Sequence, residues 1–230
     1  MREKALMRKI AVIFPGLGYT KDRPLLYYAG KIAEAHGYER RALDFSSLRL
    51  TKDGLRDPAR LEEAVERCAG MAEALWADVA LGCGKGISGS SSRVAVSVSS
   101  MSSAAEQSAK AGYGHDGESA ERADIVFISK SIGTVAASLF AKRHGIAVRQ
   151  IYFTPLEYIE HFAEADNGLV FYGDADPFAN PREIARIAEA LRLEAYCFAN
   201  ANHSLETGDV LDDIANLQKV MQIVENTFGK

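Results

Sequence analysis

The sequence predicts an α/β protein with a mostly parallel central sheet of about six strands and helices on both faces. Three observations lead to this fold class. Apolar residues run without alternation through residues 10–14 and, after Asp124, through the segment 124–128. Such runs are typical of strands buried on both faces of a parallel sheet. Segments with helical periodicity separate most of the strand candidates, and this alternation favours parallel strands joined by right-handed crossovers.

The strand candidates are short apolar segments bounded by turn residues or charged residues. In chain order they are residues 10–14, 38–45, 124–128, 148–153, 169–172 and 193–198. The second segment resembles a strand only weakly. If the first strand lies between the second and the third, the strand order is 2-1-3-4-5-6. That order puts a topological switch point between the first and third strands, where ligands bind in such sheets.

The helix candidates follow the strands and carry recognisable terminal residues. They span residues 22–37, 58–76, 132–144, 156–165, 181–191 and 209–228. Pro24 suits the first turn of the first helix, Gly145 is expected to cap the end of the third, and Asn180 is expected to cap the start of the fifth. The last helix is amphipathic, with these apolar residues on one side: Val210, Leu211, Ile214, Leu217, Val220, Met221 and Val224.

A serine- and glycine-rich segment at about residues 82–120 interrupts this order. It contains one possible strand, at 93–98, and few large apolar residues that could pack a core layer. We interpret it as an insertion or mobile loop within a single domain that spans residues 1–230.

Composition excludes several classes of function. The net charge is −4, which argues against a general nucleic-acid binder. No segment approaches the roughly 20 apolar residues that a membrane helix needs. Cys68, Cys83 and Cys197 are odd in number and lack CxxC or metal-ligand spacing, so we expect reduced thiols and no structural zinc. These features predict a soluble cytoplasmic protein without a nucleic-acid or membrane partner.

The strongest motif is Ser-Lys-Ser-Ile-Gly at residues 129–133, between a predicted strand and a predicted helix. A nucleophile elbow needs this context, because the tight turn lifts a serine hydroxyl above the sheet edge. The usual pattern is GxSxG, and Ser129 replaces its first glycine. Ser131 is therefore the candidate nucleophile. The alternative is that Ser131 only caps the following helix.

Two further candidates also follow predicted strands. Asp176 lies in a turn after residues 169–172, where a carboxylate could orient an imidazole; Asp174 in the same turn is the less favoured choice. The alternative for both is an ordinary turn aspartate. His203 is the one histidine of five that lies in a loop after a late strand, and histidine is the usual general base for a serine.

The glycine-containing turn at residues 15–18 follows the first strand. An oxyanion hole needs backbone N–H groups that a substrate oxygen can approach closely, so the N–H groups of Leu17 and Ile132 are the candidates. The alternative is a plain strand-to-helix turn. Lys130, beside the candidate nucleophile, could favour an anionic substrate, although a solvated lysine is the commoner case.

The order Ser131, Asp176, His203 is that of the α/β-hydrolase triad, and the chain resembles the small, cap-less type of that superfamily, similar to dienelactone hydrolases and esterases. The resemblance covers residues 9–45 and 124–228 and implies the six C-terminal strands of the family's eight-stranded sheet. It implies a serine hydrolase that cleaves a small ester, thioester or related acyl substrate without cofactor or metal. Pro15 departs from the family pattern, since histidine often precedes the oxyanion glycine.

Two other functions remain open at this point. The same fold could serve a non-catalytic binding or regulatory protein. Residues 84–89 match the GxGxxG pattern of a dinucleotide site, and residues 79–81 could form the strand before it. No helical pattern follows that motif, so the phosphate site at a helix N-terminus is missing. The sequence does not predict the oligomeric state.

Overall fold

The computed structural model describes residues 8–48, 54–81, 123–146 and 148–229. Within this part of the chain a six-stranded sheet has the order β2-β1-β3-β4-β5-β6, and all its neighbouring strands are parallel. The strands are β1 Lys9–Phe14, β2 Glu39–Ala42, β3 Asp124–Lys130, β4 Arg149–Phe153, β5 Gly168–Gly173 and β6 Glu194–Phe198. The predicted strand order is confirmed.

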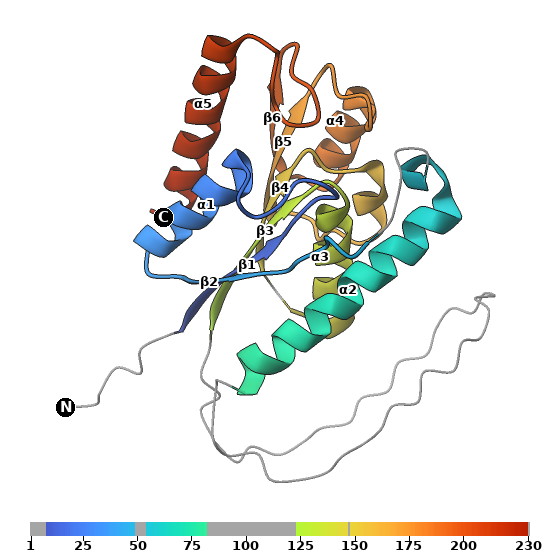
Figure 1. Ribbon diagram of the computed structural model, residues 1–230, viewed down its shortest axis with the longest axis vertical. Coiled ribbons are helices and arrows are strands. Elements are labelled where there is room, and N and C mark those ends of the chain that lie inside the picture. Colours follow the sequence, from blue (N-terminus) through green and yellow to red (C-terminus); the bar gives the residue numbers. More distant parts are fainter. Residues whose placement is uncertain (1–7, 49–53, 82–122, 147, 230) are drawn as a thin grey trace.

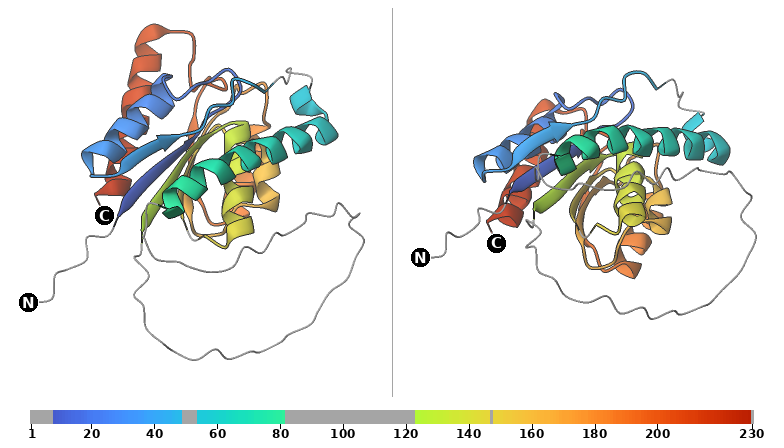
Figure 2. Two further views of the ribbon diagram at one scale, coloured as in Figure 1. Left: turned by 60° about the horizontal axis from the view of Figure 1, so that its bottom comes forward. Right: turned by 90° about the horizontal axis from the view of Figure 1, so that it is seen from below.

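Helices cover both faces of the twisted sheet (Figures 1 and 2). One layer holds α1 Pro24–Ala35 and α5 Val210–Phe228. The other holds α2 Pro58–Leu81, α3 Ile132–His144 and α4 Pro181–Ala190. Two short 3₁₀ helices, η1 Gly54–Arg56 and η2 Glu157–His161, lie in the connections.

The first strand shows why the chain adopts this layered form. Ile10, Val12 and Phe14 belong to the core on the side of α2 and α3, whereas Ala11 and Ile13 belong to the core on the side of α1 and α5. A strand with apolar residues at every position can be buried on both faces, because successive side chains point to opposite sides. The parallel strands also bring the loops after β1, β3, β5 and β6 to one edge of the sheet (Figure 1).

The last helix differs from the expected buried stripe. Val220 and Val224 are fully buried, but Val210, Leu211 and Ile214 are 70%, 77% and 58% exposed. Val210 and Ile214 instead line an open hollow together with Pro24 and Leu25 at the start of α1, so this part of the apolar stripe is not covered.

Several expected boundaries change. The segment expected as a helix at 156–165 is the shorter η2, and the second helix continues to Leu81. Residues 79–81 are therefore helical, so the strand that a dinucleotide site would need before the motif at 84–89 is absent. That motif, the possible strand at 93–98 and the rest of the segment 82–120 lie outside the described residues. Among the described helices, none is long and apolar enough to cross a membrane.

Candidate active site

Ser131 occupies the single position between β3 and α3, in a conformation that few non-glycine residues adopt. Its φ is 54° and its ψ is −126°. Its side chain makes no hydrogen bond to the first turn of α3, unlike that of an ordinary N-cap serine. Backbone strain of this kind persists only where the surrounding structure enforces it, and it is concentrated at functional sites.

Neighbouring residues enforce that turn. The Ser131 N–H donates to the carbonyl of Phe153 at the end of β4 (3.1 Å), and the Ser131 carbonyl accepts from Thr134 N (2.9 Å). Gly133 has no room for a side chain, because a Cβ there would lie 2.4 Å from the carbonyl oxygens of Phe14 and Pro15. The start of α3 can therefore pack directly against the end of β1.

Ser129 has its own role in the turn. It is fully buried, and its hydroxyl donates to the carbonyl of Ile151 in the neighbouring strand at 3.0 Å. The serine that replaces the usual first glycine thus satisfies its polar group inside the sheet, as buried hydroxyls must.

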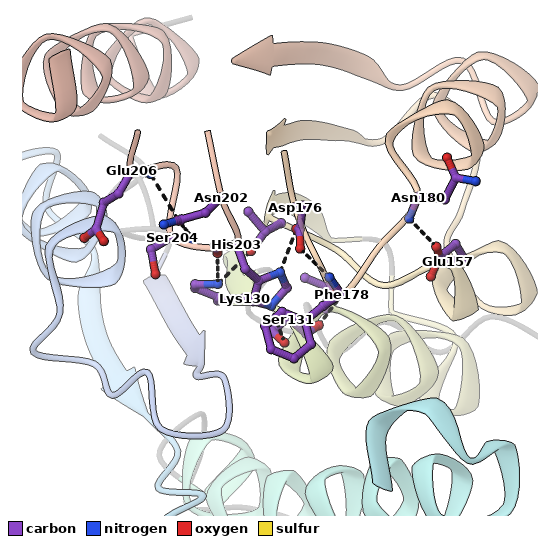
Figure 3. Close-up of polar contacts among 12 residues, drawn as sticks. Lys130, Ser131, Glu157, Asp176, Phe178, Asn180, Asn202, His203, Ser204 and Glu206 are labelled. Carbon is purple, nitrogen blue, oxygen red and sulfur yellow. Dashed lines mark hydrogen bonds and ion pairs between the residues drawn. The ribbon is translucent and has the colours of Figure 1, made fainter. Parts of the chain in front are cut away.

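Ser131, His203 and Asp176 form a continuous hydrogen-bonded chain (Figure 3). Ser131 Oγ lies 2.8 Å from His203 Nε2, and His203 Nδ1 lies 2.7 Å from Asp176 Oδ2. An ionised carboxylate only accepts hydrogen bonds, so Nδ1 carries the proton and Nε2 is free to accept from the serine. The structure thus brings together the three residues that the sequence singled out.

Asp176 is the aspartate that faces the imidazole. Its side chain is 3% exposed, and its other oxygen accepts from Phe178 N at 2.8 Å. Asp174 instead accepts from the N–H of Asn200 at 2.6 Å and so anchors the loop that carries His203. The two aspartates of the turn after β5 therefore bind different groups, and only Asp176 binds the imidazole.

The environment of His203 favours a neutral imidazole. Burial lowers its pKa, and the nearby positive charge of Lys130 lowers it further, while the carboxylate of Asp176 acts in the opposite direction. A neutral imidazole can accept the serine proton, which is what a general base requires.

The loop after β6 is held in shape by local contacts. Asn200 and Leu205 have φ of 55° and 59°, so two non-glycine residues lie in the left-handed region. Asn202 ties the loop together: its side chain accepts from Ser204 N at 2.6 Å, and its N–H donates to the carbonyl of Glu206 at 2.8 Å. Such side-chain contacts to nearby backbone groups stabilise tight turns.

The turn after β1 lies against Ser131. Gly16 and Tyr19 exchange two backbone hydrogen bonds of 3.1 and 3.3 Å, and a Cβ on Gly16 would lie 3.3 Å from the Cβ of Ser131. In the part of the chain that the structure describes, the N–H groups of Leu17 and Ile132 donate to no protein acceptor. These are the two N–H groups that the sequence suggested for an oxyanion hole.

A pocket of about 630 Å³ borders this turn, between it and the segment after β2. Leu43, Phe45 and Leu48 contribute apolar surface, and Lys21 and Asp44 contribute charged groups. Among the described residues no group of histidine, cysteine, aspartate or glutamate side chains is placed to hold a metal ion.

Lys130 does not behave as the sequence suggested. It is neither solvated nor free to meet an anionic substrate, because it is only 1% exposed. Its Nζ donates to Thr154 Oγ1 and to the backbone carbonyl of His203, both at 2.6 Å, and lies 4.7 Å from the centre of the Tyr19 ring. Tyr19 was expected from the sequence only as an aromatic residue that could line a pocket, and Thr154 was not expected at the site. The available signal for their contacts with Lys130 was a lysine between two small residues at the end of a buried strand.

The chain is similar to known proteins in structure but not in sequence. No family of known proteins matches it by sequence, and no curated protein sequence does either. An alpha-beta serine hydrolase homologue from Coxiella burnetii is 14% identical with a TM-score of 0.55, over 98% of this chain and 88% of that chain. Est1E from Butyrivibrio proteoclasticus is 10% identical (TM-score 0.57; 97% and 88%). Esterase 2 from Thermogutta terrifontis is 16% identical (TM-score 0.51; 99% and 85%).

Proposed function

We propose that this protein, which has the α/β-hydrolase fold that its sequence resembles, is a serine hydrolase acting on a small ester, thioester or related acyl compound. One observation carries the proposal: the hydrogen-bonded chain from Ser131 through His203 to Asp176, with the serine on a strained turn. The fold is shared by hydrolases and esterases, which supports the same class of chemistry, although fold alone does not fix function.

In the proposed mechanism, Ser131 attacks the acyl carbon while His203 takes the proton from its hydroxyl. Asp176 keeps Nδ1 protonated and stabilises the imidazolium that forms. The N–H groups of Leu17 and Ile132 donate to the oxyanion of the tetrahedral intermediate. His203 then protonates the leaving group, and a water molecule activated by the same imidazole releases the acyl group from the serine.

The substrate is proposed to be a small molecule whose acyl or leaving group enters the pocket beside Leu17. The volume of about 630 Å³ lies within the usual range for small-molecule sites. Its lining of apolar and charged residues suits a compound that is neither wholly apolar nor highly charged. The proposed mechanism uses no metal or cofactor.

A cytoplasmic location is part of the proposal. Cys68 and Cys197 are free thiols in the structure, as is usual in a reducing compartment.

The test is turnover of a panel of short p-nitrophenyl esters and acyl thioesters. We expect the purified protein to hydrolyse at least one of them and the Ser131→Ala variant to lose that activity. Ser204→Ala removes a serine from the neighbouring loop and serves as the matched control with wild-type turnover. Full activity in a folded Ser131→Ala protein would overturn the proposal.

A further inference from the structure

The buried amino group of Lys130 joins three loops that meet at the candidate triad. Its Nζ donates to the carbonyl of His203 in the loop after β6 (Figure 3). It also donates to Thr154 Oγ1 after β4 and lies over the Tyr19 ring after β1. Taking an ammonium group out of water costs several kcal/mol unless its donors are satisfied. The ammonium group has three N–H donors, and here it has three partners: two oxygens and the face of one aromatic ring.

Thr154 is held ready for this contact. It is fully buried and has a φ of 42°, a conformation that is costly for a β-branched residue. Its N–H donates to the carbonyl of Phe171 at 2.7 Å, which fixes the turn while the hydroxyl accepts from Lys130. The strain therefore serves to place an acceptor beside the lysine.

The backbone of His203 depends on the lysine. Local hydrogen bonds fix its loop at Asn200 and Asn202, before the histidine, and at Ser204 and Leu205, after it. Among the described residues, the hydrogen bond from Lys130 is the one that holds the His203 backbone itself. The imidazole projects from that backbone, so its distance to the serine hydroxyl depends on the carbonyl's position.

We propose that Lys130 is a positioning residue that anchors the His203 backbone and keeps the imidazole aligned between Ser131 and Asp176. Its catalytic consequence rests on the serine-hydrolase function proposed above. A misplacement of about 1 Å in a reacting group can cost about a hundredfold in rate, so a single anchor of this kind is sufficient to matter.

The position of Lys130 also couples its charge to that of the His203 imidazole. The carboxylates of Asp176 and Glu206 and the His203 imidazole interact electrostatically with the lysine, and the Tyr19 ring lies beside its Nζ. Burial lowers the pKa of Lys130 to about 7, against the opposite effect of the two carboxylates. Below that pH the lysine is charged, and its charge lowers the pKa of His203.

The experiment uses Lys130→Met and a matched control, Lys142→Met. Lys142 also donates to a histidine carbonyl, that of His161 at 2.8 Å, but it is exposed and lies on α3 away from the triad. Two quantities are measured in each protein: the pKa of the His203 imidazole by NMR, and the rate at which a fluorophosphonate labels Ser131. Circular dichroism establishes that each variant is folded.

For Lys130→Met we expect a higher His203 pKa, and labelling slower by about tenfold to a hundredfold. Lys142→Met should match the wild type in both. Should Lys130→Met fail to fold, Thr154→Val removes one acceptor and leaves the lysine; slower labelling of that variant supports the proposal, and wild-type labelling overturns it.

The two measurements separate this inference from the proposed function. Suppose that the wild type is labelled and that folded Lys130→Met has the same His203 pKa and the same labelling rate. This result overturns the role of the lysine and leaves the proposed hydrolase function intact. A wild type that is not labelled overturns the hydrolase, and an unchanged His203 pKa in folded Lys130→Met would then overturn the role of the lysine as well.

Discussion

The Ser131 hydroxyl lies 2.8 Å from His203 Nε2, although 72 positions separate the two residues in the sequence. The contact exists because β3 and β6 are parallel and end at the same edge of the sheet. The strained turn at Ser131 and the loop at His203 then face each other across that edge. The chemistry proposed for this protein depends on this one distance.

The pH dependence of hydrolysis should follow the His203 imidazole. Burial and the charge of Lys130 lower its pKa, so the neutral, basic form persists to lower pH than in an ordinary histidine. We therefore expect kcat/KM for a short ester to fall on the acid side with a midpoint below about 6.5. An acid limb centred at or above neutral pH would contradict this assignment.

Asp176→Asn should abolish most of the activity, because asparagine can donate to Nδ1 and so favour the wrong tautomer. The expected loss in kcat is about 10⁴-fold, as in other triads of this type. Asp174→Asn is the matched control, since Asp174 bonds to Asn200 N and not to the imidazole. Steady-state kinetics of both variants tests the assignment, and equal losses would contradict it.

Gly133→Ala should destabilise the protein and reduce its activity. The new Cβ would lie 2.4 Å from two carbonyl oxygens of the β1 turn, so α3 must shift. Overpacking of this kind costs about 1–3 kcal/mol in the free energy of unfolding.

The matched control for that variant is Gly70→Ala in α2. A Cβ at Gly70 meets nothing within 4 Å, so the helix should gain about 0.5–1 kcal/mol. Urea unfolding measures both changes, and a Gly133→Ala protein as stable as the wild type would show that the close approach is wrong.

Stability should depend on pH through Lys130. Burial lowers its pKa to about 7 in the folded state, whereas the unfolded chain keeps the ordinary value of 10.5. Between these values the unfolded state binds more protons, so the free energy of unfolding rises with pH. We expect the wild type to gain stability relative to Lys130→Met from pH 7 to pH 9, by chemical unfolding. A difference independent of pH would contradict the depressed pKa.

Much of the sheet and the triad could be predicted from local sequence. Continuous apolar strands, Pro24, Asn180 and Gly145 mark element positions through short-range effects, and the structure has them as expected. The strand order then brings loops to a common edge, which is why residues after strands were good site candidates.

Features that depend on distant packing could not be predicted. The burial of Lys130 is decided by Thr154, Tyr19 and the His203 carbonyl, which come from three separate loops. The exposure of Ile214 depends on the open hollow between α5, the start of α1 and the loop after β6. Neither relationship leaves a periodic pattern in the local sequence.

The most direct test of the central claim is mass spectrometry of the protein after reaction with a fluorophosphonate. We predict covalent labelling at Ser131 in the wild type and its loss in Ser131→Ala and His203→Ala. His161→Ala, a histidine outside the triad, should be labelled like the wild type. Absence of labelling in the folded wild type, or labelling that persists in Ser131→Ala, would contradict the account.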